Sequence, residues 1–222
     1  MDTAEIQVTT VVSTPFEENA YILYVGGVSE CIVIDPGMEP DAILAQLDAL
    51  RLTAVGILNT HGHGDHIAGN GALKQRWPDC PIIIGQADAP KLTDSMLNLS
   101  APFGIPMTSP PADRLVNDGD TISLAGMELK VRHIPGHSIG HVVFLGNEHH
   151  SSPLVFVGDV IFAGSIGRTD FPDGDFDTLI TGIRDKLFTL PDATLLFSGH
   201  GPTTTVGREK RHNRFVRIKS GQ

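Results

Sequence analysis

The feature that most constrains this chain is a cluster of metal-ligand side chains at residues 61–66, His-Gly-His-Gly-Asp-His. The cluster follows an apolar run over residues 55–58, which has the length of a short buried strand. Gly62 and Gly64 permit tight backbone curvature, so that several side chains can be aimed at one point. Imidazole nitrogens and a carboxylate oxygen together suit zinc, and also iron or manganese. The alternative is a solvated His-rich turn, but this density of ligand-type residues behind an apolar strand favours a metal site.

Three more ligand-type residues lie at or just after the ends of expected strands. His137 lies in Pro-Gly-His-Ser, Asp159 in Val-Gly-Asp and His200 in Ser-Gly-His-Gly. Each has a neighbouring glycine, which permits a sharp turn and a close approach of the backbone. Because strand ends converge at one edge of a sheet, we expect these three residues and the four in the 61–66 cluster to meet in one cleft.

Apolar periodicity predicts alternating strands and helices along most of the chain. Pro36 and Gly37 end one strand in a turn, and Pro40 suits the first turn of the helix that follows. We expect strands at residues 6–12, 21–25, 30–34, 55–58, 81–84, 121–124, 127–133, 142–145, 154–157 and 194–197. We expect helices at residues 40–50, 67–77, 176–188 and 207–218. No convincing linker divides the chain, so we expect a single domain over residues 1–222.

Residues 87–111 differ from the rest because five prolines interrupt any long element there. The segment still supplies apolar side chains, including Met96, Leu97, Leu99 and Phe103. Two interpretations are equally consistent with this pattern: a mobile flap over a site, or a packed irregular connection.

Composition excludes several classes of protein. The net charge of −10 disfavours nucleic acid as the main partner. The two cysteines, Cys31 and Cys80, have apolar neighbours and are predicted to be buried thiols. The first residues lack the pattern of a signal peptide, and no apolar run approaches the roughly 20 residues that span a bilayer. We therefore expect a cytoplasmic protein with no membrane partner, and the sequence leaves the oligomeric state open.

The ligand pattern as a whole resembles that of the metallo-β-lactamase superfamily. The resemblance is carried by His-x-His-x-Asp-His at residues 61–66, followed by His137, Asp159 and His200, and it extends from about residue 6 to residue 213. Residues 161–170, Ile-Phe-Ala-Gly-Ser-Ile-Gly-Arg-Thr-Asp, are similar to those of the glyoxalase II-like hydrolases and their persulfide dioxygenase relatives. The resemblance implies an α/β fold, the four-layer αβ/βα sandwich, in which two central mixed β-sheets are flanked by helices.

The resemblance also implies a set of ligands for two divalent ions, with zinc preferred and iron or manganese as alternatives. It assigns the first ion to His61, His63 and His137, the second ion to Asp65, His66 and His200, and a bridge between the ions to Asp159. Asp65 and Asp159 are expected to be catalytic as well. Each ion then keeps an open position, where a bound water is ionised near pH 7 and attacks the substrate.

Three further polar residues have two interpretations each. Arg168 follows a glycine-containing loop after Asp159 and is either a substrate-binding residue for an anion or the structural partner of Asp170 or Asp173. Asp35, in an Asp-Pro-Gly turn, either orients a metal-binding imidazole or caps the turn. His141 is expected to pack behind the ligands rather than to bind a metal.

The leading interpretation is a dinuclear metal hydrolase that cleaves an anionic small-molecule thioester, such as a hydroxyacylglutathione, by attack of a metal-bound hydroxide. With only 22 residues after His200, we expect a compact form without an additional helical domain. The alternative is a persulfide dioxygenase-like oxidoreductase that uses one iron bound by His61, His137 and Asp159. We do not expect a β-lactamase, since those enzymes are normally exported, or a nuclease, since the chain has no room for an inserted domain.

Overall fold

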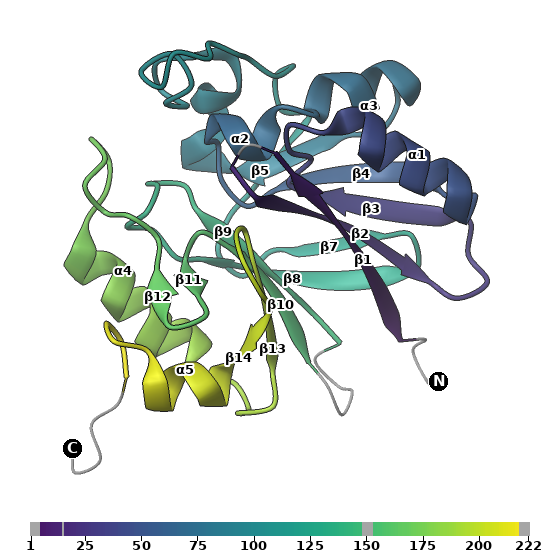
Figure 1. Ribbon diagram of the computed structural model, residues 1–222. Helices are drawn as coiled ribbons and strands as arrows, with labels where there is room; N and C mark the ends of the chain where they lie inside the picture. The colour runs from purple at the N-terminus through teal and green to yellow at the C-terminus, as the bar shows by residue number, and fades with distance from the viewer. Residues whose placement is uncertain (1–4, 15, 148–152, 218–222) are drawn as a thin grey trace.

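Two six-stranded sheets form the centre of the structure (Figure 1). The computed structural model describes residues 5–14, 16–147 and 153–217. The first sheet runs in the order β1-β2-β3-β4-β5-β6, with β1 at Ile6–Ser13, β2 at Glu18–Val25, β3 at Glu30–Ile34, β4 at Thr53–Asn59, β5 at Ile82–Gly85 and β6 at Arg114–Val116. The second runs in the order β14-β13-β10-β9-β8-β7, with β7 at Thr121–Leu124, β8 at Met127–His133, β9 at Val142–Gly146, β10 at Leu154–Gly158, β13 at Leu195–Ser198 and β14 at Thr204–Thr205. Both sheets are mixed, since β3, β4, β5 and β6 pair in parallel in the first, and β10 with β13 in the second. A short hairpin of β11 (Ile161–Phe162) and β12 (Ser165–Ile166) follows β10.

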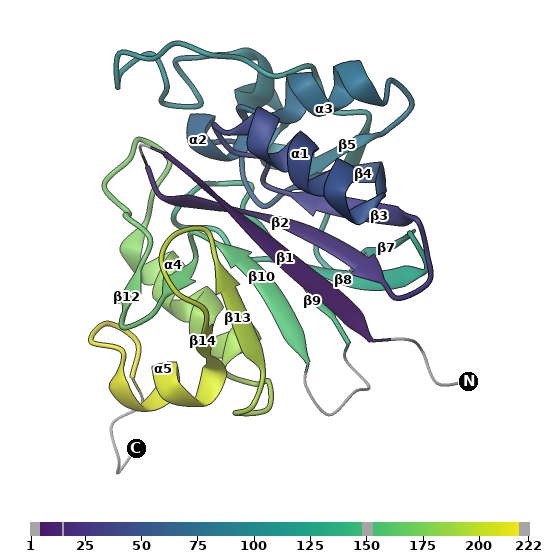
Figure 2. The same ribbon diagram turned by 45° about the vertical axis from the view of Figure 1, so that its right-hand side comes forward.

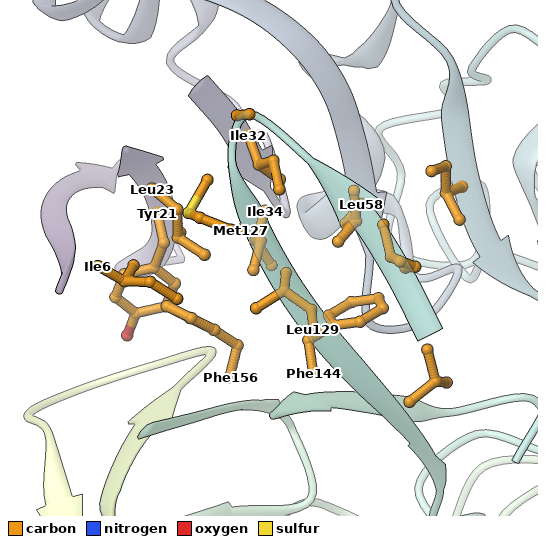
Figure 3. Close-up of a cluster of buried hydrophobic side chains, with 14 of the residues drawn as sticks. Ile6, Tyr21, Leu23, Ile32, Ile34, Leu58, Met127, Leu129, Phe144 and Phe156 are labelled. Atoms are coloured by element: carbon orange, nitrogen blue, oxygen red, sulfur yellow. The ribbon is translucent and has the colours of Figure 1, made fainter. Parts of the chain in front are cut away.

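The two sheets face each other across a shared apolar core (Figure 3). Tyr21, Leu23 and Ile34 from the first sheet belong to the same buried cluster as Phe144 and Phe156 from the second. The other face of the first sheet is also buried, so these strands are nearly continuous apolar runs rather than alternating ones. This two-sided burial explains why the strands are so clearly visible in the sequence.

Helices cover the two outer faces (Figures 1 and 2). Helix α1 (Pro40–Leu50) packs Ile43 and Leu47 on the first sheet, and α3 (Asn70–Arg76) adds Leu73. Helix α4 (Phe176–Gly182), a π-helical turn at Ile183–Leu187 and α5 (Val206–His212) pack on the second sheet. The order of layers is therefore helix, sheet, sheet, helix, which confirms the predicted αβ/βα sandwich.

The predicted elements agree with the structure in most places, but two of the expected helices differ from it. Instead of one helix at residues 67–77, the structure has the short helix α2 (Gly64–Ile67) and then α3 at Asn70–Arg76. Between them the Gly69 N–H donates to Pro36 O at 2.7 Å and the chain turns. Helix α2 begins inside the His-rich cluster and places Asp65 and His66 in its first turn. The expected terminal helix at 207–218 was too long: α5 ends at His212, and residue 218 lies outside the described residues.

Residues 87–111 form a hydrogen-bonded, irregular connection. After a 3₁₀ helix at Gln86–Thr93, the buried Asn98 amide donates to Lys91 O at 3.1 Å and to Met107 O at 3.0 Å. The segment also reaches the His-rich cluster, where Gly64 N donates to Asn98 O at 2.9 Å. These contacts favour the packed connection over the mobile flap. Among the described helices, none is long and apolar enough to cross a membrane.

Candidate metal centre

The structure brings together all seven predicted ligands. The first four follow β4 directly, His137 lies in the loop after β8, Asp159 follows β10 and His200 follows β13. The neighbouring glycines permit the close packing that was expected of them. A Cβ atom on Gly199, for example, would lie 2.3 Å from Asp159 Oδ1 and 2.7 Å from His66 Cε1.

The three-histidine group consists of His61, His63 and His137, all buried. His137 Nε2 lies 3.3 Å from His61 Nε2 and 3.0 Å from His63 Nδ1. Three imidazole nitrogens that converge in this way can bind one divalent ion and leave a further position open.

The mixed group consists of Asp65, His66 and His200. His200 Nε2 lies 3.3 Å from Asp65 Oδ2, and His66 Nε2 lies 3.7 Å from the same oxygen. His66 is fully buried, whereas the side chains of Asp65 and His200 are 22% and 26% exposed. This group is therefore the more accessible of the two.

Asp159 lies between the two groups. Its Oδ2 is 3.5 Å from His137 Nε2 and 3.6 Å from His200 Nε2, and its Oδ1 is 3.5 Å from His66 Nε2. One carboxylate thus faces nitrogens of both groups, which is the arrangement that a bridging ligand requires.

The outer hydrogen bonds show that these residues fit a metal. Nδ1 of His66 faces Asp35 Oδ2 at 3.1 Å, Nδ1 of His137 faces Arg168 O at 2.8 Å, and Nδ1 of His200 faces Phe16 O at 2.9 Å. Carboxylate and carbonyl oxygens accept hydrogen bonds, so each Nδ1 carries a proton, and each Nε2 points inward, where it can bind an ion once it has lost its own proton. Within the described part of the chain, His66 Nε2 and Asp159 Oδ1 are buried without a hydrogen-bond partner. A cation between these atoms would satisfy both.

The charge state of the centre supports the same conclusion. Burial and neighbouring imidazoles hold the pKa values of His61 and His63 well below the ordinary value, which keeps both rings neutral as metal binding requires. In the mixed group, burial disfavours the charged forms of Asp65 and His66. The neighbouring charges together have the larger effect on both pKa values. His66 lowers the pKa of Asp65 to about 2, while Asp65 and Asp159 raise the pKa of His66. The mixed group thus attracts positive charge, which a divalent ion supplies.

Asp35 orients His66. Its carboxylate accepts hydrogen bonds from Thr60 N and Thr60 Oγ1, both at 2.7 Å, in addition to the contact with His66 Nδ1. Thr60 Oγ1 in turn lies 3.0 Å from His61 Nδ1. Asp35, His61 and His66 also lie close enough to hold an ion, but the Asp35 oxygens already accept these hydrogen bonds. Of its two interpretations, the structure therefore favours that of an orienting residue.

His141 lies behind the three-histidine group, as expected. Its ring stacks on His61 with 4.7 Å between centroids, and its Nε2 accepts a hydrogen bond from Asp159 N at 3.2 Å. Its Nε2 therefore already accepts a hydrogen bond from the backbone, as expected of a residue that packs behind the ligands.

Sequence reasoning missed a buried polar cluster that contacts the loops carrying the three-histidine group. Asp88 is fully buried and accepts hydrogen bonds from Gly62 N and Gly140 N, each at 2.8 Å, and from the Ser138 hydroxyl. Lys91 Nζ donates to Ser138 Oγ and, at 2.6 Å, to Asp173 Oδ2. Asp88 follows the end of β5, which pairs with β4, so its position at a strand end was a usable signal.

Arg168 forms the structural pair that was one of its two interpretations. Its guanidinium binds Asp170 through two hydrogen bonds of 2.9 and 2.8 Å and lies 4.6 Å from the Phe171 ring centroid. The side chain is 60% exposed, and the residue lines the cavity above the metal centre. Asp173 pairs with Lys91 instead.

The cavity has a volume of about 410 Å³, within the usual range for small-molecule sites. Its lining includes His63 and His137 from the three-histidine group, Asp65 and His200 from the mixed group, and Asp159. A bound molecule can therefore reach both groups of ligands. Most other lining side chains are apolar and come from residues 98–107 and from the β11–β12 region.

Comparison with known proteins agrees with this geometry. Residues 13–200 match the family model described as the metallo-beta-lactamase superfamily. Hydroxyacylglutathione hydrolase GloC of Haemophilus influenzae is 38% identical over 210 residues, which cover 93% of this chain and 96% of GloC.

Solved structures of similar proteins share the fold over nearly the whole chain. BLEG-1, described as a B3 metallo-beta-lactamase, has a TM-score of 0.89 at 35% identity and covers 95% of this chain and 99% of its own. TTHA1623 in a di-iron-bound form has a TM-score of 0.83 at 35% identity and covers 94% of this chain and 100% of its own. ETHE1 from Myxococcus xanthus has a TM-score of 0.79 at 26% identity and covers 96% of this chain and 86% of its own. The family match over residues 13–200, together with the converging ligands, shows that this chain belongs to the metallo-beta-lactamase superfamily.

Proposed function

We propose that this chain is a two-metal hydrolase that cleaves thioesters of the hydroxyacylglutathione type. The observation that carries the proposal is the position of Asp159, which faces one histidine of the three-histidine group and both histidines of the mixed group within 3.6 Å. The similarity to hydroxyacylglutathione hydrolase GloC supports the choice of substrate class.

Two divalent ions, when bound, would ionise a water near pH 7 and polarise the substrate carbonyl. The residues of the chain hold this chemistry in place. Asp159 and Asp65 supply the negative charge of the centre, and Asp35 fixes the ring of His66. No serine or cysteine nucleophile is needed. We propose zinc as the resident metal, with iron as the alternative supported by the di-iron form of TTHA1623.

A second candidate is the persulfide dioxygenase-like activity with one iron at His61, His137 and Asp159. The similarity to ETHE1 supports it, and His137 Nε2 lies within 3.5 Å of both His61 Nε2 and Asp159 Oδ2. Hydrolysis is favoured because the mixed group would have no role in a reaction at a single iron.

Anaerobic turnover separates these candidates. The zinc-loaded protein is expected to release thiol from S-lactoylglutathione without oxygen, because hydrolysis needs no redox-active metal. An inert zinc form, together with oxygen consumption by the iron form on glutathione persulfide, would replace hydrolysis by the second candidate. A chromogenic cephalosporin belongs in the same assay because of the similarity to BLEG-1, and faster cleavage of it than of any thioester would overturn the proposal.

A further inference from the structure

The cavity above the metal centre has a wall of apolar side chains. Part of the wall comes from the irregular segment and part from the β11–β12 hairpin; we call Leu99, Phe103, Ile105, Met107, Phe162 and Ile166 the apolar wall. Phe103 is 55% exposed and Ile105 is 39% exposed. Large apolar side chains that gather around a cavity with their surfaces open to solvent indicate a ligand that covers them.

One residue of the wall, Leu99, is held in an unfavourable backbone conformation. Leu99 has a φ of +67°, a region that bulky residues without special support rarely adopt. The support comes from its neighbours: Asn98 donates to Met107 O at 3.0 Å, and Ser100 Oγ accepts from Met107 N at 3.0 Å. A conformation that is unfavourable and yet fixed by its surroundings is typical of a functional site. Here it keeps Leu99 in the lining of the cavity.

The charged side chains of the cavity also favour an apolar ligand. Among the described residues that line it, Arg168 is the only lysine or arginine, and its guanidinium is already paired with Asp170. An acyl group that carries carboxylates would therefore find no unpaired lysine or arginine in this lining, whereas an apolar acyl group would find a large complementary surface.

From these observations we infer that the site selects thioesters whose acyl group is an apolar chain, which lies against the apolar wall. This inference rests on the proposed thioester hydrolysis and adds its substrate class. Water supplies a hydroxyl group to the acyl carbon, the C–S bond breaks, and the thiol leaves with the remaining proton of that water. The products are a carboxylic acid and a free thiol.

A chain-length series tests the inference. The substrates are thioesters of one small neutral thiol, N-acetylcysteamine, with acetyl, butyryl, hexanoyl and octanoyl groups, and S-lactoylglutathione serves as the reference. Burial of one methylene predicts that kcat/KM rises by about two- to fourfold for each carbon added, until the cavity is filled.

Leu99→Ala and Leu97→Ala form a matched pair for this test. Both remove the same atoms from the same segment, but Leu97 is 49% exposed and does not line the cavity. Leu99→Ala is expected to lower kcat/KM about fivefold or more for the octanoyl thioester and less than about twofold for the acetyl thioester. Leu97→Ala is expected to leave the whole series unchanged, and equal thermal midpoints of the two variants would show that folding is not the cause.

The outcomes separate this inference from the proposed function. If the thioesters are hydrolysed but the series is flat or falls with length, the inference is wrong and the proposed function stands. The inference is also wrong, and the proposed function stands, if Leu99→Ala lowers kcat/KM equally for all the thioesters. If no thioester is hydrolysed, S-lactoylglutathione included, both are overturned.

Discussion

The carboxylate of Asp88 accepts a hydrogen bond from the backbone N–H of Gly62, with 2.8 Å between Asp88 Oδ2 and Gly62 N. Its other oxygen accepts from Gly140 N at 2.8 Å, and the Ser138 hydroxyl donates to the same carboxylate. Gly62 lies between two members of the three-histidine group, and Ser138 directly follows the third. One buried carboxylate therefore fixes both loops that carry this group.

Asp88→Asn should weaken the three-histidine group. The amide nitrogen would face a backbone N–H donor in a buried place, so we expect the metal-free protein to lose about 1–3 kcal/mol of unfolding free energy. We also expect zinc to be lost to a chelator at a lower chelator concentration than in the parent protein. Asp94→Asn is the control, since it makes the same change at an exposed turn where Asp94 accepts from Met96 N. Equal zinc retention by both variants would show that Asp88 does not position the histidines.

Asp159→Ala should affect both groups at once, because its two oxygens face nitrogens of both. We expect bound zinc to fall to one ion per chain or fewer. Turnover should fall by about a hundredfold or more, since even the loss of an outer partner of a ligand costs ten- to a hundredfold. Elemental analysis and a thioester assay on the same sample measure both effects, with the exposed Asp79→Ala as the control. A fully active Asp159→Ala protein would rule out the bridging assignment.

The role of Arg168 in substrate binding can be tested through its partner. Asp170→Asn removes the charge that pairs with the guanidinium, so it should lower KM for anionic thioesters if Arg168 binds the anion. If Arg168 has this role, Arg168→Ala should also raise KM for the anionic substrates and leave neutral thioesters unchanged. Both side chains are exposed, so little change in stability is expected. Equal effects on anionic and neutral thioesters would assign Arg168 a structural role alone.

The two cysteines should be unreactive in the folded protein. Burial raises the pKa of both Cys31 and Cys80 to about 12 from an ordinary 9.0, so at pH 8 the thiolate fraction falls about a thousandfold. A disulfide reagent should modify neither thiol until the chain is denatured. Because the folded-state pKa is the higher one, the stability due to the protonated thiols is complete below pH 9 and is lost as the pH rises towards 12. Rapid modification of native protein at pH 8 would contradict the burial, and Cys31→Ala and Cys80→Ala would identify the reactive thiol.

Much of this fold could be predicted because the longer strands show one of two clear patterns. Residues 30–34 form β3, which is apolar and buried on both faces after its first residue, whereas residues 121–124 and 127–133 form β7 and β8, in which buried and exposed residues largely alternate. All three strands have the expected bounds. The short strands β6, β11, β12 and β14 have only two or three residues, too few for a period to be visible. The division between α2 and α3 depends on a hydrogen bond to Pro36, more than thirty residues away, which no local pattern contains.

The convergence of the seven candidate ligands could be predicted because they share a local signal, a polar residue with a glycine at the end of an apolar run. The residues around them have no such common signal. Asp88 orients two loops through backbone N–H groups, and its partners lie 26 to 52 residues away in the sequence. The apolar wall is formed by segments that pack together only in the folded chain, so its residues look like ordinary core positions in the sequence.

The measurement that tests the account most directly is a zinc titration of the metal-free protein. Bound zinc and thioester turnover are determined on the same samples. The account predicts saturation at two ions per chain, with turnover that reaches its maximum only as the second ion binds. Full turnover with one ion per chain, or no turnover with two, would contradict it.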